Sequence, residues 1–168
     1  MTLESRLPLR SPAEEPDAEP AEARAKSGVP LPGFHVHCPI EVRFRDCDAM
    51  GHVNNAVYLT YLEQARFAYW KAADIGRLAG EVSYIIARVE IDFRAPATTG
   101  QSLAVAVAVT GFGRTSFKMG YEIRDAEGRL VATAKSVQVA YDYAAGKTIP
   151  LVEAIRERIE EFEGRQLS

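Results

Sequence analysis

The sequence has few cysteines, no excess of positive charge and no long apolar run. Only two of its 168 residues are cysteines, Cys38 and Cys47, too few for a disulfide framework, so both thiols are expected to be free. Twenty basic and twenty-three acidic side chains leave a net charge of -3, which excludes the basic field that drives nucleic-acid binding. No apolar stretch approaches the roughly 20 residues that cross a bilayer, and no secretory signal is recognisable. These absences predict a cytoplasmic protein whose partners include neither nucleic acid nor membrane.

The first 34 residues differ in composition from the rest of the chain. They contain six of its nine prolines, and most of the residues between them are Ala, Glu, Ser or Arg. Such a segment buries too little apolar surface to offset the entropy of ordering, so residues 1–34 are predicted to be a disordered tail. Residues 35–168 are predicted to form one domain, which is long enough to build a core without metals or disulfides.

Hydrophobic periodicity predicts strands and helices in a fixed order. A strand begins near His37 and places Ile40, Val42 and Phe44 inward. A helix over 55–74, closed by Gly76, is apolar over most of its circumference and therefore belongs in the interior. Strands follow over 83–93, 102–110, 115–124 and 130–141, and a charged amphipathic helix opens near Pro150, with residues 156–163 as its solvated face. The economical arrangement is of the α+β class, with one antiparallel sheet wrapped around the long helix.

The strand over 102–110 is apolar on both faces. Its valines and Leu103 point to one side and its alanines to the other. Neither face can be left in water, so one is expected to pack on the long helix and the other on a second subunit or on the C-terminal helix. This pattern predicts a homo-oligomer.

The densest polar cluster runs from Arg45 to Asn55, directly before the long helix. It combines the carboxylate of Asp48, the flexible backbone of Gly51 and a helix N-terminus whose N–H groups can bind an oxygen of rising negative charge. This combination suits acyl transfer, in which a carboxylate attacks or activates water while N–H groups stabilise the oxyanion. The alternative is structural, with Asp48 and Asn54 only capping the helix and shaping the loop.

The stretch R-F-R-D-C-D-A-M-G-H-V-N-N-A-V-Y-L-T-Y-L-E-Q-A-R resembles the signature of the 4-hydroxybenzoyl-CoA thioesterase-like group of hotdog-fold acyl-CoA thioesterases. The resemblance continues through residues 88–96, 113–117 and 131–142, and covers roughly residues 38–163. It implies a hotdog fold, with a five-stranded antiparallel sheet wrapped around a long central helix and a C-terminal surface helix. It also implies an acyl-CoA substrate, no metal or redox cofactor, and a homodimer or homotetramer with its active site at a subunit interface.

The resemblance also assigns roles to individual residues. Asp48 matches the catalytic carboxylate, which acts as nucleophile or general base. Asn55 falls where a backbone N–H at the helix start polarises the thioester carbonyl, and His52 is a supporting residue. The implied substrate-binding residues lie in the loop, on the helix and in a later turn: Gly51, Asn54, Tyr58, Glu63, Arg114, Thr115 and Ser116. The last three are expected to contact the CoA moiety, often from the neighbouring subunit.

Two other chemistries are weaker interpretations of the same residues. Cys47 and His52 could form a thiol nucleophile pair, but side chains alternate along an extended segment, so the Cys47 thiol should point away from Asp48 and pack in the interior. His35, His37 and Cys38 could be metal ligands, but no second cluster completes a tetrahedral set.

Further alternatives concern the helix, the later turn and the type of protein. Glu63 lies three residues before Arg66 on the helix, so an ion pair between them competes with a role at the substrate. Residues 111–116 resemble a nucleotide-binding loop, but they join two strands and open no helix, which favours a hairpin turn. An acyl-ACP thioesterase, another hotdog enzyme and a non-catalytic acyl-CoA-binding module are the competing functions.

Overall fold

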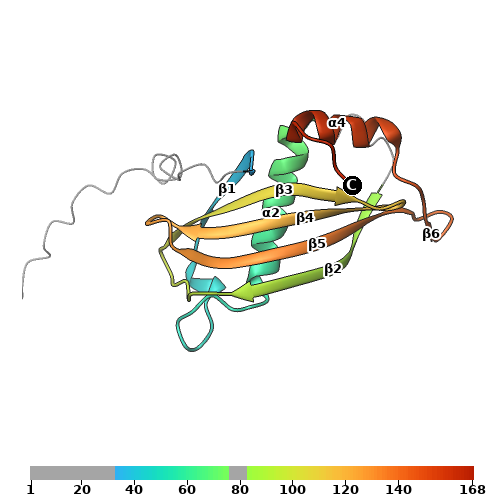
Figure 1. Cartoon of the computed structure of the whole chain (residues 1–168). Coiled ribbons are helices and arrows are strands. Elements are labelled where there is room, and N and C mark those ends of the chain that lie inside the picture. The colour runs from blue at the N-terminus through green and yellow to red at the C-terminus, as the bar shows by residue number, and fades with distance from the viewer. Residues whose placement is uncertain (1–32, 76–82) are drawn as a thin grey trace, which may run out of the picture.

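Five long antiparallel strands form one curved sheet that wraps around a helix (Figure 1). The computed structural model describes residues 33–75 and 83–168. The strand order is β1-β3-β4-β5-β2, and the short β6 pairs with β5. The strands span Val36–Glu41 (β1), Ser83–Phe93 (β2), Ser102–Phe112 (β3), Ser116–Asp125 (β4), Leu130–Asp142 (β5) and Lys147–Thr148 (β6). The five long strands were predicted from periodicity, and β6 was not.

The central helix α2 runs over Val57–Ala72 and packs against β1 and β3. Its buried side chains recur every three or four residues and therefore form one face, made up of Tyr58, Tyr61, Leu62, Ala65 and Tyr69. The helix predicted over 55–74 is confirmed, slightly shorter at both ends. One antiparallel sheet around one long helix is the hotdog arrangement that the sequence predicted.

The opposite side of α2 is open in the single chain. The side chain of Phe67 is 68% exposed and that of Leu59 is 47% exposed. The helix was predicted to belong in an interior because it is apolar over most of its circumference, and in the single chain the sheet covers only one side of it.

The inner face of the sheet supplies most of the core. The four residues of β4 that were predicted to point inward are all buried, namely Phe117, Met119, Tyr121 and Ile123. Both faces of β3 are buried as well, since Val107 and Ala106 are each at most 1% exposed. This confirms that β3 lies inside the structure on both sides.

The segment after β1 departs from the predicted strand. The chain leaves the extended conformation after Glu41 and forms the 3-10 helix η1 over Phe44–Asp46. The carboxylate of Asp46 accepts the backbone N–H of Arg43 at 3.0 Å, which turns the chain at this point. Phe44 therefore lies 86% exposed instead of facing inward. A side chain that captures a backbone donor overrides the alternating pattern.

Other predicted boundaries changed or lie elsewhere. The C-terminal helix α4 begins at Glu153 and ends at Glu163, so Pro150 precedes it by a short extended segment and is not its first residue. The Leu151 N–H in that segment donates to the Arg114 carbonyl at 3.1 Å, which delays the helix. Gly76, predicted to close the long helix, and residues 1–32 of the predicted tail lie outside the described residues.

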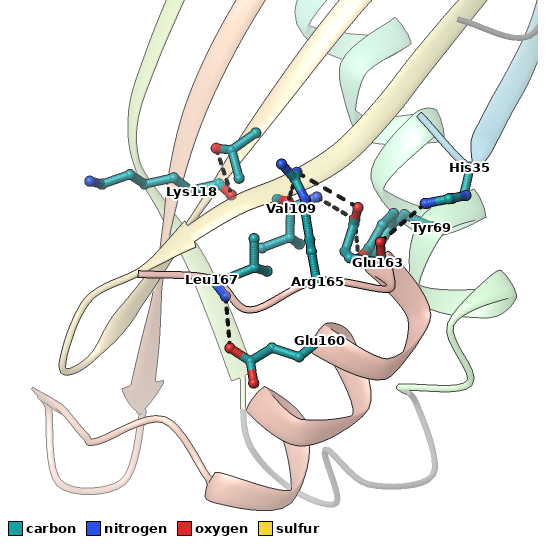
Figure 2. Close-up of polar contacts among 9 residues, drawn as sticks. His35, Tyr69, Val109, Lys118, Glu160, Glu163, Arg165 and Leu167 are labelled. Carbon is teal, nitrogen blue, oxygen red and sulfur yellow. Dashed lines mark hydrogen bonds and ion pairs between the residues drawn. The ribbon is translucent and has the colours of Figure 1, made fainter. Parts of the chain in front are cut away.

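Helix α4 is fastened to the rest of the fold by a buried carboxylate (Figure 2). The Glu163 Oε1 atom accepts hydrogen bonds from the Tyr69 hydroxyl at 2.7 Å and from the Val109 N–H at 2.8 Å. Residues 156–163 were predicted to be a solvated face, which is wrong for Glu163, since it is only 5% exposed. The helix is amphipathic as expected, with Ile155 and Ile159 on its buried side.

These contacts close an open edge of the sheet. Strand β1 begins at Val36, which pairs with Val107, so the backbone of β3 has no strand beside it at Val109. The Glu163 carboxylate binds the Val109 N–H, and the Arg165 guanidinium donates to the Val109 carbonyl at 3.2 Å. Two side chains thus take the place of a neighbouring strand.

Candidate active site

The first aspartate of the D-x-D motif is structural. Asp46 is 3% exposed, and its two oxygens accept hydrogen bonds from the Arg43 side chain at 2.9 and 3.1 Å and from the Tyr61 hydroxyl at 2.9 Å. Burial opposes the charge on this carboxylate, but the hydrogen bonds from Arg43 and Tyr61 outweigh it and hold its pKa below the ordinary value. Asp46 therefore ties the loop to helix α2. This role is not visible in the sequence, because Tyr61 lies fifteen residues further along the chain.

The second aspartate, Asp48, is half-buried in a tight loop. Its backbone N–H donates to the His52 carbonyl at 2.8 Å, and its carbonyl accepts the Gly51 N–H at 3.0 Å. Gly51 has φ of 79°, a left-handed conformation that glycine adopts without steric cost. The Asp48 Oδ1 atom accepts the Met50 N–H at 2.8 Å. Its Oδ2 atom receives no hydrogen bond from the described residues, so one carboxylate oxygen remains open for chemistry.

The start of helix α2 is stabilised by Asn54 and not by Asp48. The Asn54 Oδ1 atom accepts the Ala56 N–H at 2.9 Å, and the Asn54 carbonyl accepts the Val57 N–H at 2.9 Å. The Asn55 N–H, which precedes these two donors in the chain, finds no acceptor within the described parts of the chain. Asp48 thus does not cap the helix, and a free backbone donor stands at its N-terminus, as an oxyanion site requires.

Asp48 and the helix start share one pocket of about 380 Å³. The pocket lies where the loop, the first turn of α2 and the end of β2 meet. Its lining includes four of the predicted site residues and five that were not predicted: Asp48, His52, Asn55 and Tyr58, together with Val53, Phe93, Arg94, Ala95 and Pro96. The segment 93–96 was not assigned to the site because only the closure of the fold brings the end of β2 beside the loop.

Aromatic rings form one wall of the pocket. The Tyr58 ring meets Phe93 edge to face with centroids 5.0 Å apart and meets Tyr61 at 5.8 Å. Burial raises the pKa of the Tyr58 hydroxyl, and the nearby Cys47 adds to the rise. The Tyr58 hydroxyl is therefore a hydrogen-bond donor at neutral pH.

Several predicted site residues lie away from this pocket. Gly51 and Asn54 shape the loop and the helix start but are not among the residues that line it. Glu63 is exposed on α2, and within the described segments no ion pair joins it to Arg66. Arg114 and Thr115 belong to the turn between β3 and β4 and Ser116 begins β4, and this turn lies at the opposite end of the sheet from the C-terminal end of β2 (Figure 1).

The strand register gives the scale of that separation. Ser116 pairs with Val139, which in turn pairs with Ile85 of β2, whereas the pocket contains Phe93 of the same strand. At about 3.3 Å per residue, the turn and the pocket are about 26 Å apart along the sheet. The turn of one chain therefore does not reach the Asp48 of the same chain.

The alternative chemistries receive no support from the geometry. The Cys47 sulfur lies 3.2 Å from the Thr99 hydroxyl and packs against the core, so it does not face the pocket. Among residues 33–75 and 83–168, no three His, Cys, Asp or Glu side chains gather as a metal site. Within the same ranges no helix is long and apolar enough to span a membrane. Residues 113–115 form the turn between β3 and β4, within the stretch 111–116 that was predicted to be a hairpin turn.

The chain is similar in sequence to known thioesterases. The model of the thioesterase-like superfamily matches residues 42–159. The long-chain acyl-CoA thioesterase FadM of Escherichia coli is 29% identical over 126 residues, which are 73% of this chain and 96% of FadM. A 1,4-dihydroxy-2-naphthoyl-CoA hydrolase of Synechococcus elongatus is 28% identical over 69% of this chain and 88% of its own length.

Solved structures of thioesterases are also similar to this chain. A thioesterase from Thermus thermophilus, crystallised with coenzyme A and zinc, is 40% identical, with a TM-score of 0.71 over 80% of this chain and 99% of its own. The probable thioesterase YbaW of Escherichia coli is 28% identical, with a TM-score of 0.65 over 76% of this chain and 98% of its own.

Proposed function

Because this chain belongs to the thioesterase-like superfamily, we propose that it hydrolyses an acyl-CoA thioester to a carboxylic acid and free CoA. The observation that carries the proposal is the shared pocket of Asp48 and the start of α2. Asp48, with one carboxylate oxygen that accepts no hydrogen bond from the described residues, and Asn55, whose backbone N–H is unpaired among them, both line this pocket. These are the two groups that acyl transfer needs.

The carbonyl oxygen of the thioester binds at the start of helix α2. The Asn55 N–H and the positive end of the helix dipole stabilise the negative charge that develops on this oxygen during attack. Tyr58 lines the same pocket, and its hydroxyl is a second candidate donor. His52 holds the loop through its backbone carbonyl and lines the pocket opening.

Asp48 supplies the attack on the carbonyl carbon by one of two routes. As a nucleophile, its oxygen forms a C–O bond while the C–S bond breaks, CoA leaves as a thiolate and water then hydrolyses the mixed anhydride. As a general base, it takes a proton from water, whose oxygen forms the C–O bond, and the departing thiolate accepts a proton. Rapid-quench mass spectrometry separates the routes, since only the first adds the mass of the acyl group to the chain.

The active protein is a homodimer or a homotetramer. Strand β2 is the free edge of the sheet over its eleven residues, and it exposes Ile86 by 43% and Phe93 by 50%. A long unpaired edge strand of this kind tends to pair with another chain. A second copy would also cover Phe67 of α2 and could bring its own residues 114–116 to the CoA moiety. A monomeric mass by light scattering at micromolar concentration contradicts this part of the proposal.

The decisive variant is Asp48→Asn, which keeps the shape of the side chain and removes its charge. We expect kcat to fall by about 10² to 10⁴, the scale of a positioned acid–base group, with little change in KM. The amide still accepts the Met50 N–H, so the thermal midpoint should stay near that of the wild type. The measurement is thiol release from acyl-CoA together with a thermal melt.

Cys47→Ala is the matched control, since it alters the neighbouring residue and should leave kcat within a few-fold of wild type. If Cys47→Ala is inactive while Asp48→Asn keeps more than about a tenth of kcat, the thiol mechanism replaces the one proposed here.

A panel of substrates addresses the competing functions. The relatives act on long-chain and on naphthoyl thioesters, so short, long, branched and aromatic acyl-CoAs should all be tried. Turnover of acyl-ACP in preference to acyl-CoA identifies an acyl-ACP thioesterase. Tight binding of CoA esters without any turnover identifies a binding module.

A further inference from the structure

A loop over residues 46–54, here called the site loop, and helix α2 contribute separate groups to the candidate active site. Asp48 lies inside the site loop, whereas the free Asn55 N–H stands directly before the helix. The site loop is closed at its base, because the Asp46 carbonyl accepts the Asn54 N–H at 2.9 Å. Acyl transfer depends on the distance and angle between the attacking group and the oxyanion donor, so the placement of the site loop against the helix matters.

Backbone contacts hold the site loop to the segment that joins β2 to β3. The Val53 N–H donates to the Ala97 carbonyl at 2.9 Å, and His52 forms a single β-bridge with Thr98. A second bridge, between Cys47 and Val53, closes the site loop on itself. None of these contacts reaches α2, so they fix the site loop against the sheet but not against the helix.

One side chain of the helix reaches back to the site loop. The Tyr61 hydroxyl, on the second turn of α2, donates to the Asp46 Oδ2 atom at 2.9 Å. Among the described residues this is the one side-chain hydrogen bond that joins the site loop to α2. Asp46 and Tyr61 are both buried, and a hydrogen bond shielded from water is electrostatically stronger than one at the surface.

Both ends of this hydrogen bond are held in place by other contacts. Arg43 donates to the Asp46 carboxylate from its backbone N–H at 3.0 Å and from its guanidinium at 2.9 and 3.1 Å, which sets the direction of the carboxylate. The Tyr61 ring packs edge to face on Tyr58, a residue of the pocket, with centroids 5.8 Å apart. The hydrogen bond therefore joins a fixed point on the site loop to a fixed point on the helix.

We propose that Tyr61 is a positioning residue, which holds the Asp48 carboxylate through Asp46 in the geometry that acyl transfer needs. Tyr61 is not among the residues that line the pocket, so it acts through the site loop and not on the substrate. The inference rests on the proposed function. A displacement of about 1 Å between reacting groups can cost about 10² in rate, so the loss of this one hydroxyl should be visible in kcat.

The same helix carries a matched control. Near its other end the Tyr69 hydroxyl donates to the Glu163 Oε1 atom at 2.7 Å (Figure 2). Both partners are buried, as in the pair of Tyr61 and Asp46. In each pair the carboxylate oxygen keeps another hydrogen-bond donor when the tyrosine hydroxyl is removed. A Tyr→Phe change at either position therefore removes one buried hydroxyl and keeps the ring, but Tyr69 is bonded to the C-terminal helix and not to the site loop.

Thermal melts and acyl-CoA hydrolysis compare Tyr61→Phe with Tyr69→Phe in the full chain. Both variants should lower the thermal midpoint by similar amounts, because each loses one buried hydrogen bond. Only Tyr61→Phe should lower kcat, by about ten- to a hundredfold, with KM within about threefold of wild type, since it displaces the reacting groups and leaves the contacts to CoA intact. Tyr69→Phe should keep kcat within about threefold of wild type.

Hydrogen exchange tests the link between the helix and the site loop without turnover. The amides of Asp48 and Asn54 are both bonded to carbonyls inside the site loop, so they report on how firmly it is held. Their exchange should accelerate at least about tenfold in Tyr61→Phe, because the site loop opens more often when it is no longer bonded to α2. In Tyr69→Phe the same two amides should exchange at the wild-type rate.

The inference is overturned if Tyr61→Phe keeps kcat within about threefold of wild type while Asp48→Asn loses activity, a result that leaves the proposed function standing. It is also overturned if Tyr69→Phe loses as much kcat, or if Tyr61→Phe raises KM at unchanged kcat, because neither result needs a displaced Asp48. A wild type without thioesterase activity refutes the proposed function instead. Site-loop amides that exchange at the wild-type rate in Tyr61→Phe refute the link between Tyr61 and the site loop, whether or not the protein turns over acyl-CoA.

Discussion

The loop after β1 and the end of the C-terminal helix each bury a carboxylate, and they satisfy it differently. In the loop, both oxygens of Asp46 receive hydrogen bonds from Arg43 and Tyr61. At the end of α4, Oε1 of Glu163 accepts two hydrogen bonds, whereas Oε2 accepts none within the described residues and lies 3.9 Å from Arg165. Each carboxylate fastens backbone elements to one another.

Asp48 lies two residues from Asp46 in the same loop, but its oxygens are bound differently. A carboxylate whose oxygens are all bound has no atom left for a reaction, so Asp46 serves the structure. Asp48 keeps one oxygen open toward a pocket, so it is suited to chemistry. Residue type alone does not separate these roles. The two roles are distinguished by the number of hydrogen-bond donors that surround each oxygen.

Among substitutions of a carboxylate by its amide, the largest effect on stability is expected for Asp46→Asn. The amide cannot accept the full set of hydrogen bonds, and one of its N–H groups faces the Arg43 guanidinium. Breaking a buried pair costs about 3–5 kcal/mol, and partial exposure of Arg43 reduces the expected loss to about 2–3 kcal/mol. Urea unfolding measures this loss. Asp48→Asn, the same substitution two residues away, should cost less than about 1 kcal/mol, and equal losses would remove the distinction between the two aspartates.

A smaller effect is expected for Glu163→Gln. The Gln carbonyl oxygen can still accept the Tyr69 hydroxyl and the Val109 N–H, so the loss should be about 1 kcal/mol. Glu163→Ala removes the acceptor, leaves both donors buried without a partner and should cost about 3 kcal/mol. Hydrogen exchange at the Val109 amide should accelerate in the Ala variant and much less in the Gln variant. Equal exchange in both would mean that the carboxylate does not hold this edge of β3.

The smallest expected effect is a change in the free energy of unfolding at acidic pH. The pKa of Asp46 is lower in the folded than in the unfolded chain, so its charge stabilises the fold fully above the unfolded value of about 3.9. This contribution is lost as the pH falls through the lower folded pKa. The difference in unfolding free energy between wild type and Asp46→Asn should therefore be constant between about pH 5 and 8 and shrink below about pH 4. A difference that grows on acidification would mean that the carboxyl is protonated in the folded state.

Much of the fold was predictable because it depends on near neighbours in the chain. The inward residues of β4 follow strict alternation, and the buried face of α2 recurs at helical spacing. Prediction failed where a specific hydrogen bond overrides the periodic pattern. Phe44 continues the alternation of β1, yet the hydrogen bond between Asp46 and Arg43 turns the chain and leaves Phe44 in solvent.

The candidate site also contains residues that the sequence reveals and residues that only the fold brings together. A carboxylate and a glycine directly before a long helix are visible in the sequence, and they led to Asp48 and the start of α2. The wall formed by residues 93–96 could not be found this way, because strand pairing brings it to the loop from forty residues further along. Arg114, Thr115 and Ser116 remain predictions, since a single chain holds them far from Asp48.

By itself, the sequence determined the order of elements and the antiparallel sheet around a long helix, which follow from periodicity and turn chemistry acting over a few residues. Its resemblance to a known family implied the hotdog class and the position of the candidate loop. Only the tertiary structure decided which acidic side chains are structural. Asp46 became structural through Tyr61 on α2, and Glu163 became buried because β1 does not extend beside Val109 and leaves the backbone of β3 to be satisfied. Burial and hydrogen-bond partners depend on which surfaces meet, and that is settled only when the sheet closes around the helix.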